Sequence, residues 1–170
     1  MRTLIAALCL CVCAFAASDA SQPTAAEVQK RFVGHWRLVT FENFDEKGVG
    51  TVAAYDGGRI MYDVAGNMSA QLMRSDRALL TPPSGGKPSP TAQAERAAAY
   101  STYTAYYGKY SLNPATRAVT HHVEGSVNPN WVKTDLVRYY AFADDGKRLM
   151  LSLKNAEGRV TGTLTWERLQ

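Results

Sequence analysis

The chain has 170 residues, a formal net charge of +4 and 20% charged residues. This length is ample for one hydrophobic core. Its lysines and arginines are scattered singly and form no stripe that could follow a phosphate backbone, so we expect no nucleic-acid partner. After residue 20 no apolar run reaches the roughly 20 residues that a membrane-spanning helix needs.

Residues 1–20 have the layout of a secretory signal peptide. Arg2 provides a positive start, a short apolar run covers residues 4–17, and Ala16, Ala17 and Ala20 offer cleavage sites. The three cysteines all lie in this segment, so the mature chain would have no thiol and no disulfide. We therefore expect a periplasmic or secreted protein without an anchor.

Residues 21–33 are predicted to hold one short helix ahead of the main domain. Thr24 is a suitable N-cap, and Glu27 stands three residues later, where a capping box places its acidic partner. Val28 and Phe32 form the apolar stripe of this helix.

From residue 34 onward, runs that alternate with a period of two predict strands. These runs are residues 35–41, 59–63, 68–73, 102–112, 118–125, 132–142, 148–153 and 160–169. Short clusters of Gly, Asn, Asp and Pro separate most of them, which indicates sequential antiparallel neighbours. The sequence thus predicts an all-β domain over residues 34–170, an up-and-down antiparallel barrel of about eight strands.

One stretch interrupts the strands. Residues 74–91 contain four prolines and two glycines and cannot form a regular element, and residues 92–99 favour a short helix. Between two barrel strands, this helix-containing loop could be a lid over the barrel mouth or a mobile surface excursion.

The first and the last predicted strand carry a family resemblance. Gly34 and Trp36 open the first strand and Arg168 closes the last, which resembles the Gly-x-Trp signature of lipocalins and the arginine that packs on that tryptophan. Longer stretches resemble the lipocalin-like domain family of bacteria and fungi, a relative within the calycin superfamily. They are residues 34–39, 66–74, 103–110, 121–126, 129–138 and 164–168. The resemblance implies a barrel with a cavity, and it implies no single activity.

Candidate ligand-binding residues come from the predicted inner face. Alternation places His121 beside two valines, where it would contact a ligand or be a core histidine satisfied by a tyrosine. Tyr106 and Tyr110 share a face with Gly108, whose missing side chain leaves room beside them. Arg138 lies mid-strand on a mostly apolar face and needs an ion-pair partner or a ligand carboxylate.

Glu124 is a candidate partner for Arg138, and it also belongs to an alternative site. His122 and Glu124 share the opposite strand face from His121, where they form a solvated pair or an acid–base pair. In the second case the protein would be a small cavity enzyme, an isomerase, cyclase or hydrolase. Because adjacent strand residues point in opposite directions, His121 and His122 cannot bind one ion, and we expect no metal and no cofactor.

These patterns together favour an exported protein that binds a small apolar or amphipathic molecule in the barrel cavity. Catalysis is the less favoured interpretation. The sequence leaves the ligand and the oligomeric state open.

Overall fold

The computed structural model describes residues 22–81 and 90–170. The predicted signal peptide and its cysteines lie outside these residues, as does much of the proline-rich loop. Among the described residues, no helix is both long and apolar enough to cross a membrane.

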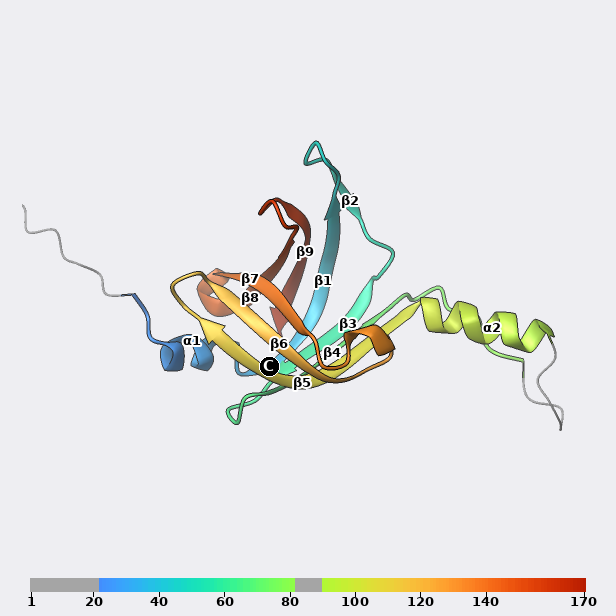
Figure 1. The fold of residues 1–170 in the computed structure, drawn as a ribbon, viewed down its shortest axis with the longest axis horizontal. Helices are drawn as coiled ribbons and strands as arrows, with labels where there is room; N and C mark the ends of the chain where they lie inside the picture. Colours follow the sequence, from blue (N-terminus) through green and yellow to red (C-terminus); the bar gives the residue numbers. More distant parts are fainter. Residues whose placement is uncertain (1–21, 82–89) are drawn as a thin grey trace, which may run out of the picture.

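The described part of the chain contains two α-helices, nine strands and two short 3₁₀ turns (Figure 1). The helices are α1 (Ala25–Phe32) and α2 (Pro90–Ser101). The first strands are β1 (Gly34–Phe44), β2 (Gly50–Val52), β3 (Gly57–Tyr62), β4 (Asn67–Met73) and β5 (Tyr103–Asn113). The others are β6 (Ala118–Ser126), β7 (Asp135–Ala143), β8 (Arg148–Lys154) and β9 (Val160–Arg168), with 3₁₀ turns at Pro129–Trp131 and Asp144–Gly146.

The sheet is a meander that closes on itself. From β3 to β9 each strand pairs antiparallel with the next, and β9 returns to β1 with a register that runs from Trp36↔Arg168 to Asn43↔Gly162. Strand β3 pairs with the start of β1, and the short β2 pairs with its end. The two strands therefore count as one strand of the barrel. The predicted eight-strand antiparallel barrel is confirmed, and its closure leaves few unpaired strand edges.

Helix α1 covers one end of the barrel. Thr24 accepts a hydrogen bond from the Glu27 backbone, and the Glu27 carboxylate accepts one from the Thr24 backbone at 2.7 Å, which is the predicted capping box. The apolar stripe of the helix is buried, and the ring of Phe32 meets Tyr62, Tyr140 and Phe142 edge-on at 5.0–5.2 Å. We call this end the closed end.

We call the opposite end the open end. Strand β1 finishes there, and strand β5 begins there. Helix α2 leads into β5 there but extends away from the barrel instead of lying across it (Figure 1). Its described side chains are mostly exposed. This part of the predicted lid is therefore a surface excursion.

Two smaller features differ from the sequence prediction. Strand β2 was missed because it has three residues, all exposed, and so carries no alternation. Residues 132–134 were expected to begin a strand, but they form the turn that follows Pro129–Trp131, with Lys133 at a positive φ of 63°.

Candidate ligand site inside the barrel

The closed end is built around Trp36, which is fully buried. The Arg168 guanidinium lies 4.1 Å from the centre of the indole ring, and its Nη1 donates to the Val33 carbonyl at 2.7 Å. Gly34 has a φ of +132°, and a Cβ there would lie 2.7 Å from that same Nη1. Glycine is therefore required where the chain passes Arg168, and this end of the barrel is plugged.

His121 lies at the centre of a buried polar chain. Its Nε2 is 2.8 Å from the Tyr62 hydroxyl and its Nδ1 is 3.0 Å from the Tyr106 hydroxyl. All three side chains are on the inner face, and His121 is 0% exposed. The structure thus gives this histidine two tyrosine partners, one of the arrangements expected from the sequence.

Burial keeps His121 neutral. Desolvation, reinforced by the positive charge of Arg138, lowers the pKa of His121 to about 3. Desolvation likewise raises the pKa of Tyr62 and of Tyr106 above their usual value. One imidazole nitrogen therefore carries a proton and donates, while the other accepts from a tyrosine.

Tyr110 is committed to the closed end. Its hydroxyl donates to the Asp63 carbonyl at 2.8 Å and accepts from the Gln29 side chain at 3.2 Å, and its ring packs on Phe32. It lies on the inner face as expected, but both hydroxyl functions are already used by the protein.

Arg138 lies on the inner face of β7, opposite Val119, and it is half-buried. Its Nη1 donates to the Val137 carbonyl at 2.9 Å. Burial raises the pKa of Tyr106, and both the charge of Arg138 and a hydrogen bond from it oppose this rise. The positive charge of the guanidinium therefore acts on the Tyr106 hydroxyl.

The expected ion pair between Arg138 and Glu124 is not formed. Glu124 is exposed on the outer face, and β6 places Val119 opposite Arg138, five residues away from Glu124. No salt bridge between described residues involves Arg138. The predicted ion pair was wrong because the sequence alone does not give the register between β6 and β7.

Inner-face side chains near α1 are mostly buried, although Leu112 and Phe142 are only partly buried there. Toward the open end, Leu72, Leu136 and Leu153 are also only partly buried. A hollow of about 190 Å³ lies at the open rim, lined by Tyr55, Thr104, Trp131 and neighbouring residues. The edge-on contact between Trp131 and Tyr106, at 5.8 Å, connects this rim to the polar chain.

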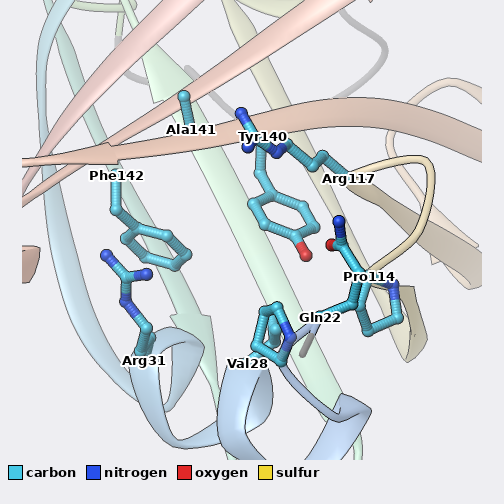
Figure 2. Close-up of a pocket in the computed structure, with 9 residues that line it drawn as sticks. Gln22, Val28, Arg31, Pro114, Arg117, Tyr140, Ala141 and Phe142 are labelled. Atoms are coloured by element: carbon cyan, nitrogen blue, oxygen red, sulfur yellow. The ribbon is translucent and has the colours of Figure 1, made fainter. Parts of the chain in front are cut away.

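A second hollow lies outside the closed end, between α1 and β7 (Figure 2). It has a volume of about 260 Å³, and the ring of Tyr140 lies at its centre, between Phe142 and Pro114. Arg31 and Arg117 border it. None of the predicted ligand-binding residues lines this pocket.

The alternative catalytic residues face outward. His122 donates from Nδ1 to the Asp135 carboxylate at 2.7 Å, its Nε2 lies 2.9 Å from the Ser111 hydroxyl oxygen, and it makes no hydrogen bond to Glu124. The side chains of His122 and Asp135 are 42% and 62% exposed. A Ser–His–Asp order is present, but His122 and Asp135 are exposed on the outer face of the barrel, and none of the three residues lines a main pocket of the described part of the chain.

Gly108 has a different role from the one expected. A Cβ there would lie 2.0 Å from the His122 carbonyl oxygen and 2.9 Å from the Glu124 backbone nitrogen. The register of β5 and β6 shifts at this point, so the absent side chain makes room for a bulge in β6 and not for a ligand.

A comparison with known families adds to this geometry. The sequence pattern described as a lipocalin-like domain matches residues 33–169. The chain belongs to the lipocalin-like domain family. Among solved structures, this lipocalin-like domain is similar to a redesigned β-barrel, with a TM-score of 0.43 and 12% identity, over 88% of this chain and all of the other. Comparison with curated proteins finds no match.

The sequence alone did not identify several residues of this candidate site in the lipocalin-like domain. No motif sets Tyr62 apart from the other tyrosines, although its alternation with Ile60 places it on the inner face. Its contact with His121 spans from β3 to β6 and exists only because the sheet curves. Tyr55 and Trp131 lie in connections, which carry no alternation. Among the described residues, no group of three His, Cys, Asp or Glu side chains could hold a metal ion.

Proposed function

We propose that this lipocalin-like protein is an exported carrier that binds a small apolar or amphipathic molecule in the open half of its barrel. The observation that carries the proposal is Arg138, a cation on the inner face that stays half-buried. A barrel filled solidly with side chains would not keep a partly hydrated guanidinium inside, because an isolated charge is costly to bury. Ligand binding is also the general role that a lipocalin-like barrel suggests.

The lining of the open half suits an apolar guest. Partly buried leucines of β4, β7 and β8 would contribute most of the affinity, at about 25 cal/mol per Å² of apolar area buried, less the cost of association. His121 would contribute indirectly, because its hydrogen bond fixes the orientation of the Tyr106 hydroxyl. Export is supported by the signal-peptide layout of residues 1–20, and mass spectrometry of the mature protein from its host should find a start after Ala16, Ala17 or Ala20.

The test of binding fills the open half with a larger side chain. Leu72 is on the inner face, beside Gly58, and Met73 is the next residue on the outer face. We expect Leu72→Trp to weaken binding of the neutral fluorescent probe N-phenylnaphthylamine by about tenfold or more, through loss of cavity volume. Met73→Trp, the matched control, should bind as the parent does.

Fluorescence titration of the three proteins gives the answer, with urea unfolding to verify that each is folded. If the folded parent protein binds no probe, or if both tryptophan variants bind it equally well, the interior of the barrel is not the binding site.

A further inference from the structure

The inner face of the barrel has an uneven set of polar groups. In the described strands, the Asp and Glu side chains all belong to the outer face: Glu42, Glu124, Asp135 and Glu167. Arg138 is thus an inner-face cation with no inner-face carboxylate on any described strand. The indole Nε1 of Trp166, which is 1% exposed and also on the inner face, is a donor without a partner among the described residues.

The polar chain around His121 adds hydrogen-bond donors to this inner face. If the imidazole proton is on Nδ1, it is donated to Tyr106, the Tyr62 hydroxyl donates to Nε2, and the Tyr106 hydroxyl proton is free to point to the ligand. If the proton is on Nε2, Tyr106 donates to Nδ1 and its oxygen is exposed to the positive charge of Arg138. In both tautomers, the groups that face the open half are hydrogen-bond donors.

Resting on the proposed carrier function, we infer that the ligand is an amphipathic carboxylate, whose acid group binds Arg138 and Tyr106 while its apolar part lies against the leucines of the open half. A guanidinium with remaining N–H groups suits a carboxylate, which offers acceptors only. A neutral alcohol would satisfy one donor and leave the positive charge unpaired.

The experiment compares decanoate with decanol, each competing with N-phenylnaphthylamine at neutral pH and low salt. The parent protein should bind decanoate at least about tenfold more tightly than decanol, which is the size of effect that a charge-assisted hydrogen bond provides. Arg138→Met, which keeps much of the side-chain volume, should lose this preference and still bind decanol.

Arg59→Met is the matched control. Like Arg138, Arg59 donates from Nη1 to the carbonyl of the preceding residue, at 3.0 Å, but it lies on the outer face of β3. It should keep the full preference for decanoate.

The outcomes separate the two proposals. If neither the probe nor decanol binds to the parent protein, the carrier function fails. If both bind but decanoate has no advantage, or if Arg138→Met keeps that advantage, the carrier function stands and the carboxylate inference is overturned.

Discussion

At the scale of single residues, the stability of the barrel depends on a few side chains that make several hydrogen bonds each. Arg168 donates to backbone carbonyls of the α1 segment and of the turn before β8, and it also covers Trp36. Arg37, by contrast, is an exposed residue of β1 that pairs with Glu167 at the surface. The two arginines therefore differ in how much stability they should provide.

Replacing Arg168 with alanine should lower the free energy of unfolding by about 2–4 kcal/mol, because the change removes hydrogen bonds to three backbone carbonyls, two of them part-buried, and uncovers an indole ring. Arg37→Ala should cost less than about 1 kcal/mol, as exposed ion pairs do. Urea unfolding monitored by tryptophan fluorescence measures both. Equal losses for the two variants would show that Arg168 does not plug the barrel.

His121 makes stability depend on pH. Its pKa is about 3 in the folded protein and about 6.5 in an unfolded chain, so between these values the unfolded state binds the extra proton. The contribution of His121 to stability is therefore fully present above pH 6.5 and is lost as the pH falls toward 3. The limiting slope is about 1.4 kcal/mol per pH unit.

We expect His121→Gln, which remains polar and does not titrate, to have a shallower decline of unfolding free energy between pH 7 and pH 4 than the parent protein has. Urea midpoints across this range provide the measurement, and the difference between the two slopes cancels the carboxylates common to both. Parallel curves would mean that His121 is protonated as readily in the barrel as in the unfolded chain.

At the scale of elements, the bulge in β6 positions the polar chain. Gly108 lets the His122–Glu124 backbone approach β5 closely, and the register shift occurs at this point. On one side of the bulge Tyr110 pairs with His121, and on the other Tyr106 pairs with Ser126. The bulge thus sets how far along β6 the imidazole lies from each tyrosine.

Gly108→Ala should destabilise the protein by about 3 kcal/mol or more, because the new methyl group meets backbone atoms that cannot rotate away. Gly57→Ala is the control, since the nearest atom to a Cβ there, the Met73 carbonyl oxygen, is 3.6 Å away. Thermal or urea unfolding compares the two. A Gly108 variant as stable as the Gly57 variant would contradict the close approach of the strands.

The elements themselves were largely predictable from local pattern. The runs of alternating residues and the capping box at Thr24 and Glu27 are local features, and the eight longer strands and α1 appear where these features predict them. The three-residue β2 has no such pattern, and residues 132–134 continue an alternating run but form a turn. The conformation of these two segments is set by hydrogen bonds to β1 and β6, respectively.

At the scale of the whole molecule, the site could be predicted only in part. Alternation correctly placed His121, Tyr106 and Arg138 on the inner face, because that assignment needs only one strand at a time. The hydrogen bond between Tyr62 and His121, the missing ion pair of Arg138 and the outward pairing of His122 with Asp135 depend on register and curvature across several strands. No local pattern contains that information.

The two ends of the barrel differ in how they are filled. One end is plugged by Phe32, Trp36 and Arg168, and the other has partly buried leucines around an unpaired cation. The pocket between α1 and β7 competes with the open half as a place for a ligand, because Arg31 and Arg117 border it (Figure 2).

A crystal structure of the protein grown with decanoate decides between these two places most directly. The account predicts density for the ligand in the open half of the barrel, with its carboxylate within hydrogen-bond distance of Arg138. Density in the pocket beside Tyr140, or an interior filled by protein side chains alone, would contradict it.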